Sequence, residues 1–235
     1  MAKLTLLQMT QDILNDMDSD PVNSIDDTDE SIQVAQIVKT TYFNITSQRD
    51  WPFLRTLSAL TGLGDTNNPT KMQIPTTSNK IHWIKYNKKD VTYLEPKVFL
   101  DKIQDRDVDD ADVDANGYRT DQDPTYWTTY DDEYVIFDSF DSAVDTTLQS
   151  SKSSAYVTLI PSWTVEDAFV PTLPEKMFPT LLAAAKATSF STLKQVANPS
   201  AEAFATRGIV RAQNEAWKTK QAESKSNRIN YGRKP

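Results

Sequence analysis

The chain has 235 residues, a formal net charge of −8 and no cysteine. This length allows one large or two small domains, each with a buried core. The lack of cysteine excludes a disulfide framework and thiol catalysis, and it fits an intracellular site of synthesis. No apolar run approaches the roughly 18 residues of a membrane-spanning helix, and no signal-peptide pattern is present, so we expect no membrane contact.

The negative charge is not spread evenly along the chain. Residues 218–235 hold six basic residues and one acid, so the rest of the chain has a charge of −8 − 5 = −13. An acidic body repels phosphate and argues against broad binding of nucleic acid. The basic segment has almost nothing apolar to bury, so we expect a tail that orders only against another surface.

Two amphipathic helices are predicted at the N-terminus. The first covers residues 3–17, where Leu6, Ile13 and Leu14 belong to one apolar stripe. Asp27 and Glu30 have the spacing of a capping box and predict the start of a second helix, which continues to about Arg49. Pro52 ends it, because the residue before a proline is biased away from helical geometry.

Short β-rich segments follow from about residue 55 to 170. They are separated by clusters of Asp, Asn, Pro and Ser, as in a small sandwich or barrel. The expected strands lie at 70–75, 80–87, 91–96, 124–130, 133–140, 155–161 and 163–169, with a short helix near 97–105. Asp131 and Asp132 are expected at the turn of a hairpin.

Two further helices are predicted after this region. The first spans 178–196 and is rich in alanine, and the second begins at Pro199 with Asn198 as its N-cap. Since neither helical pair can bury its stripe alone, we expect one antiparallel bundle. The predicted fold class is α+β: bundle halves at 1–54 and 171–219, an inserted, mostly antiparallel β-sandwich or barrel-like domain at 55–170, and an extended basic tail at 220–235.

One motif has the spacing of a calcium-binding loop. Residues 112–123 place Asp112, Asp114 and Asn116 at the first, third and fifth positions, and Asp123 at the twelfth. Arg119 and Pro124 depart from the pattern of such loops. The alternative interpretation is an acidic loop in which Asn116 and Gly117 form a turn.

Catalytic chemistry is not indicated. His82 is the sole histidine and alternates with apolar residues along a predicted strand, which favours a structural role. Close carboxylate pairs such as Asp131 and Asp132 arise easily among 33 acids. We therefore expect a protein that is not an enzyme. A calcium-stabilised binding module and, less favoured, a virion-associated hydrolase remain the alternatives.

Four stretches carry a resemblance to a known family: 6–17, the helix and Arg-Asp-Trp end of 25–53, the strand-to-helix passage of 156–190, and 198–217. The chain resembles the head-to-tail adaptor proteins of short-tailed bacteriophages, the tail tubular protein A group. The resemblance covers the helical half and its junctions with the β region. The inserted region at 55–155 is longer than in the smaller members.

The resemblance implies a structural virion protein at the head–tail junction, made in the host cytoplasm. It implies a dodecameric ring of neighbouring adaptor subunits between the portal protein and the tail nozzle, with possible contact to tail fibres. DNA would pass through the channel without binding specifically to it. The protein would need no cofactor. The basic tail would dock on the portal through Lys218, Lys220, Lys225, Arg228, Tyr231, Arg233 and Lys234. We expect a monomer that assembles on the portal.

Overall fold

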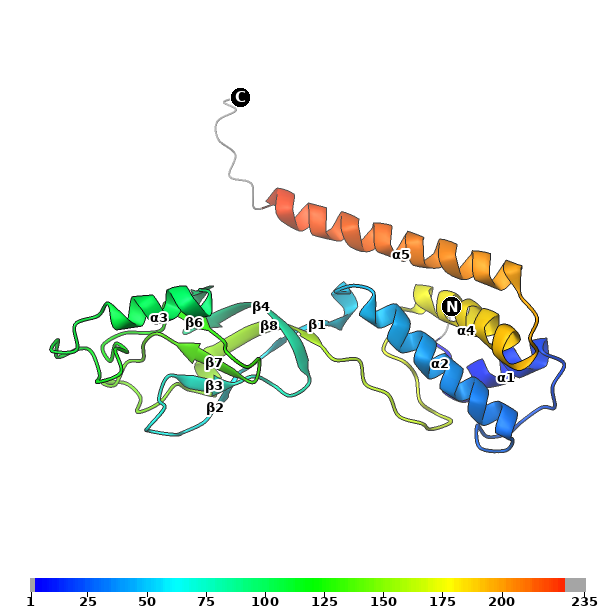
Figure 1. Ribbon diagram of the computed structural model, residues 1–235, viewed down its shortest axis with the longest axis horizontal. Helices are drawn as coiled ribbons and strands as arrows, with labels where there is room; N and C mark the ends of the chain where they lie inside the picture. The colour runs from blue at the N-terminus through cyan, green and yellow to red at the C-terminus, as the bar shows by residue number, and fades with distance from the viewer. Residues whose placement is uncertain (1–2, 227–235) are drawn as a thin grey trace, which may run out of the picture. The chain divides into compact units, whose positions relative to one another are not determined.

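The computed structural model describes residues 3–226, with side chains to residue 218. It is a mixed α+β structure that divides into two compact units (Figure 1). The helical unit contains residues 1–54 and 161–235, and the β unit contains residues 55–160. The predicted insertion of a β region between two helical segments is therefore present in the chain.

The helical unit places helices from both ends of the chain around one core. Leu6, Ile13, Val38, Tyr42 and Leu181 are among its fully buried side chains. Helices α1 and α2 contact each other, and both contact α4, which in turn packs against α5. Its elements are α1 (Leu6–Asp16), α2 (Asp29–Ser47), η1 (Pro52–Leu54), η3 (Glu175–Met177), α4 (Phe178–Leu193) and α5 (Pro199–Ser226).

Capping boxes begin the first two helices. At α1, Thr5 and Gln8 exchange side-chain and backbone hydrogen bonds. At α2 the pair is Thr28 and Ser31, so the predicted pair Asp27 and Glu30 was wrong by one residue. The Asp27 carboxylate instead accepts hydrogen bonds from the preceding backbone N–H groups of residues 23 and 24.

The segment 163–169 is not a strand, contrary to the prediction. Its backbone carbonyls at Phe169 and Asp167 accept hydrogen bonds from the first N–H groups of α1, at 2.7 and 3.2 Å. Trp163 packs its ring against Tyr42 and Phe169 in the helical core. The β unit consequently ends at Ile160, ten residues before the predicted boundary at 170.

The β unit is built on one curled, eight-stranded sheet with the order β1-β8-β4-β5-β6-β7-β3-β2 (Figure 1). Within the described residues, every strand pairing is antiparallel except that of β5 with β6. Its elements are β1 (Arg55–Ser58), β2 (Thr61–Gly62), β3 (Lys71–Gln73), β4 (Ser78–Tyr86), β5 (Lys89–Tyr93), α3 (Pro96–Gln104), β6 (Tyr126–Thr128), β7 (Tyr134–Phe137), η2 (Ser150–Lys152) and β8 (Ser153–Leu159).

The sheet curls around its own core, so it has the form of a half-barrel and not of two stacked sheets. Ile84, Trp127, Val135, Phe137 and Val157 come from the strands of this sheet and are all buried in its core. The predicted hairpin is confirmed: β6 and β7 pair antiparallel, and Asp132 adopts a positive φ of 58° at the turn. The predicted short helix is α3.

Helix α5 extends further than the sequence predicted. It continues to Ser226, so residues 220–226 of the expected tail are helical. Along the described part of the chain, no helix is long and apolar enough to cross a membrane.

Candidate docking surface on the last helix

Helix α5 begins with the predicted cap. The Asn198 side-chain oxygen accepts a hydrogen bond from the Ala201 backbone N–H at 3.2 Å and another from the Ser200 hydroxyl at 2.9 Å. Pro199 occupies the first helical position, where its missing N–H costs no helical hydrogen bond. The start of the helix is therefore defined by local sequence alone.

Small side chains bring α5 close to α4. Ala205 is buried, and Ile209, Ala212 and Ala216 pack against the core of the helical unit. The closest approach is at Gly208, where an added Cβ would lie 2.2 Å from the Thr180 hydroxyl oxygen. Position 208 has to be glycine for the helices to lie at this separation.

Two polar contacts fix the middle of α5. The Arg49 guanidinium, just after α2, donates a hydrogen bond to the Gln213 carbonyl at 2.9 Å. Lys176 in η3 forms an ion pair with Glu215, and Arg211 lies 3.7 Å from the same carboxylate. The hydrogen bond from Lys176 lowers the pKa of Glu215, with help from the nearby positive charges. The helix is thus attached at several points along its inner side.

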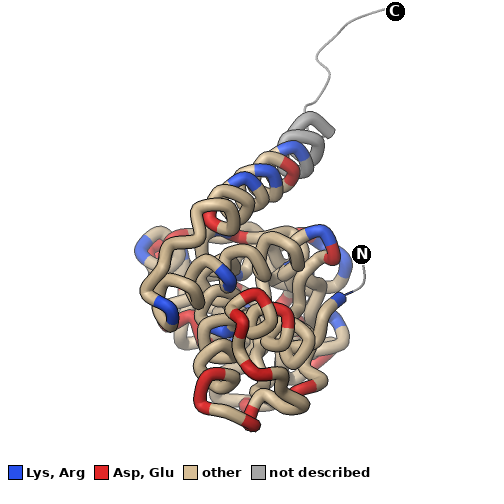
Figure 2. Tube along the Cα trace, turned by 90° about the vertical axis from the view of Figure 1, so that its right-hand side faces the viewer, with Lys and Arg blue, Asp and Glu red and all other residues tan. Residues whose placement is uncertain are grey.

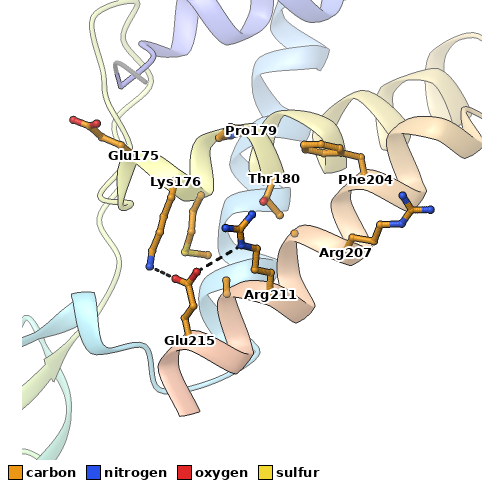
Figure 3. A pocket seen from close by; sticks show the side chains of 11 residues that line it. Glu175, Lys176, Pro179, Thr180, Phe204, Arg207, Arg211 and Glu215 are labelled. Atoms are coloured by element: carbon orange, nitrogen blue, oxygen red, sulfur yellow. Dashed lines mark hydrogen bonds and ion pairs between the residues drawn. The ribbon is translucent and has the colours of Figure 1, made fainter. Parts of the chain in front are cut away.

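A cavity of about 660 Å³ lies between α5 and the start of α4 (Figure 3). Met177, Pro179 and Ala212 contribute apolar surface, while Arg207 and Arg211 come from α5. Figure 3 shows Lys176 and Arg211 directed toward Glu215, with Phe204 and Arg207 further along the helix. The cavity therefore combines an apolar lining with a charged edge in which basic side chains outnumber the carboxylates of Glu175 and Glu215.

The surface of α5 outside its buried stripe, here called its outer side, exposes large apolar residues next to basic ones. Phe204, Val210 and Trp217 are 55%, 49% and 59% exposed. Basic residues recur along the same helix, as the blue segments of Figure 2 show. Arg207 is among the exposed basic residues. Aromatic residues and arginine dominate binding energy at protein interfaces, so this side has the composition of a docking surface.

Only part of the predicted portal-docking set can be placed. Lys218 is exposed on α5, where it lines a second, open depression together with Arg211 and Asn214. Lys220 and Lys225 lie on α5, but their side chains are outside the described set. Arg228, Tyr231, Arg233 and Lys234 lie outside the described residues.

The predicted calcium ligands do not converge. Asp114 accepts hydrogen bonds from the N–H groups of Asn116 and Tyr118, and Asp123 accepts from Asn87 and Lys89, both at 3.0 Å. Lys89 and Asn87 outweigh the effect of burial and lower the pKa of Asp123. Among the side chains described, those of residues 3–218, no group of three or more His, Cys, Asp or Glu residues is arranged to hold a metal ion.

The turn that was the alternative to a calcium site is present. Gly117 has a φ of 83°, and its N–H donates to the Asp114 carbonyl at 2.9 Å. An added Cβ at Gly117 would lie 2.5 Å from the Ile103 carbonyl oxygen, so the loop returns close to the end of α3. In the β unit, His82 contacts the Thr158 hydroxyl at 2.8 Å, as expected of a structural histidine.

The sequence interpretation missed the outer side of α5. It identified the buried stripe at Ala205, Ile209, Ala212 and Ala216, and placed all docking residues at or beyond Lys218. The signal that could have found this side was the position of Phe204, Val210 and Trp217 off that stripe, since apolar residues on the polar side of a helix indicate a second contact.

Neither the scan of protein-family models nor the search of curated proteins found a match to this chain.

Proposed function

We propose that the protein is a structural connector, a head-to-tail adaptor that forms a ring between a phage portal and the tail nozzle. One observation supports it most. The helical segments that precede and follow the 106-residue β unit in the sequence share one hydrophobic core. The proposal includes an antiparallel arrangement of α1, α2, α4 and α5. The ring is dodecameric, and it has the portal, nozzle, fibres and neighbouring subunits as partners.

Charge supports a role beside DNA without binding it. The chain has a net charge of −8, and an acidic channel wall repels the phosphate backbone. In this proposal DNA passes through the ring, which has neither catalytic activity nor a cofactor. Helix α5 extends to Ser226. In this proposal the basic residues from Lys218 onward dock on the portal.

The direct test mixes the purified full chain with the portal protein of its own phage and images the product. We expect a ring of added density on the portal, while the chain alone elutes from gel filtration as a monomer. Head-to-tail contacts between subunits are all satisfied only in a closed ring, so we expect assembly to depend on the portal as a template. A portal that stays bare at high concentrations of the chain would contradict the proposal.

A further inference from the structure

The cavity beside α5 and a loop in the β unit have complementary chemistry. The cavity has an apolar lining and a charged edge, where three basic side chains, Lys176, Arg207 and Arg211, outnumber the carboxylates of Glu175 and Glu215. Arg207 is exposed, and Arg211, although 3.7 Å from Glu215, is 85% exposed, so both guanidinium groups are accessible to a partner. Such an edge favours an anionic partner, and the neighbouring Phe204 favours one that also brings an apolar side chain.

The loop that follows α3 offers this combination. Residues 105–114 contain six aspartates, and Val108 in their midst is 56% exposed. Arg106 is the basic residue of this stretch, and it is directed inward: it pairs with the buried carboxylate of Asp138 at 2.7 Å. The outer surface of the loop is therefore acidic around one aliphatic side chain.

The loop is also shaped before any partner arrives. The Asp107 side chain accepts a hydrogen bond from the Asp109 N–H at 3.0 Å, and Asp110 accepts one from the Asp112 N–H at 3.3 Å. The Asp107 carbonyl accepts from the Asp110 N–H. A preformed loop loses less conformational entropy on binding than a disordered one.

We infer that the cavity between α4 and α5 of one copy receives the acidic loop 105–114 of a second copy, with Val108 at the apolar lining and the aspartates against Arg207 and Arg211. The inference rests on the ring of the proposed function. The two surfaces differ, so the contact is heterologous and repeats from copy to copy until it closes. Its charged, exposed edge predicts weak association in dilute solution that decreases with salt.

The lack of native cysteine makes the contact directly measurable by cross-linking. One full-length copy carries Ala111→Cys in the acidic loop, and a second, tagged copy carries Ala203→Cys on the exposed side of α5. A short bismaleimide is added to the mixture at high protein concentration, without portal. Ala143→Cys, at an exposed alanine in another loop of the β unit, replaces Ala111→Cys in the matched control.

We expect the mixed dimer to form mainly from the Ala111→Cys and Ala203→Cys pair. Adding R207E and R211E to the α5 copy should reduce its yield about tenfold, the effect of a loss near 1.4 kcal/mol in contact free energy. Circular dichroism should show that this variant, altered at exposed positions, remains folded. A yield no higher than that of the Ala143→Cys control would overturn the inference.

Two further experiments are needed. The first distinguishes a contact between copies from a contact within one copy, and the second distinguishes failure of the inferred contact from failure of the proposed ring. If one chain that carries both cysteines cross-links within itself while mixed single-cysteine chains do not, the loop binds its own copy and the inference is wrong. If the portal acquires a ring but no mixed cross-link forms there, the inference alone fails. If the cross-link forms but the portal stays bare, the proposed function fails and the contact between copies stands.

Discussion

Both units have an apolar core, but small residues let two helices approach closely in the helical unit, whereas the β unit also buries a charged group next to the end of α3. Asp138 is 1% exposed and accepts hydrogen bonds from the Thr125 and Tyr126 N–H groups and from Arg106. Gly208 against Thr180 is the corresponding point in the helical unit. One unit thus depends on polar satisfaction and the other on close packing.

This difference has a cause in the elements themselves. Helices satisfy their own backbone hydrogen bonds, so their packing needs only matching surfaces. The strands of the β unit are short, and the loops between them leave backbone groups that side chains must satisfy. The Asp138 carboxylate accepts a hydrogen bond from the Thr125 N–H and another from Arg106, just after α3. Arg106 also donates to the Gly117 carbonyl.

Removing the central carboxylate should have the largest effect. Asp138→Ala removes the carboxylate that pairs with one Arg106 nitrogen and accepts from two backbone N–H groups, which should cost about 3–5 kcal/mol of the free energy of unfolding. Chemical denaturation measures the loss, and hydrogen exchange should locate it in the β unit. The control is Asp145→Ala, whose pair with Lys152 is about one-third exposed on each side and should cost at most about 1 kcal/mol. Equal losses would contradict the role given to Asp138.

The packing point of the helical unit should give a smaller loss. In Gly208→Ala the new methyl group meets the Thr180 side chain, so α5 has to move away from α4 at a cost of about 1–3 kcal/mol. Thr180→Ala removes the two closest atoms, and the double variant should recover much of the loss. A double-mutant cycle measures this coupling, and strict additivity would show that the two positions do not meet.

A charged contact at the edge of the helical unit should contribute less, and only over a defined pH range. Burial alone would lower the pKa of Lys186, but its hydrogen bonds and charge interactions with Asp12 and Asp16 outweigh this and raise it. A raised pKa means that the stabilisation is complete below the ordinary lysine pKa of about 10.4 and is lost as the pH rises through the raised value.

Lys186→Met isolates this contribution. The stability difference between wild type and variant should be about 1 kcal/mol or less at pH 8, because both aspartates are nearly half exposed. It should shrink above a pH of about 10.4. Tyrosines also titrate in this pH range, but they do so in both proteins, so their effect cancels in the difference between wild type and variant. Urea unfolding at both pH values measures it, and a constant difference would show that the charge of Lys186 contributes nothing.

The acidic loop should respond least. Since the carboxylates of Asp114 and Asp123 are directed to different partners, we expect the same melting temperature with calcium as with chelator. A ligand that binds only the folded state raises the melting temperature, so a reproducible rise with calcium, absent with magnesium, would show that the loop rearranges into a site.

The same contrast explains what the sequence could predict. Apolar periodicity located α1, α2, α4 and α5, and local cap chemistry located the start of α5 at Asn198. The start of α2 was misplaced because the Asp27 carboxylate binds N–H groups before it, a choice that spacing alone does not distinguish. Strand β1 and the role of 163–169 depend on partners far along the chain, in β8 and α1.

The docking surface was predicted only in part for a similar reason. Basic composition pointed to the end of the chain, and Lys218 does lie exposed on α5. Arg207 and Phe204 became candidates because they line a cavity together with residues of η3 and α4. The apolar pattern of one helix does not show which elements pack beside it.

The central claim, that the C-terminal basic segment attaches this protein to a portal ring, is tested most directly by truncation after Lys218. Binding of the full and truncated chains to immobilised portal protein is measured at one salt concentration, with circular dichroism to show that both are folded. The account predicts that the full chain binds and the folded, truncated chain does not. Equal binding by the two chains would contradict it.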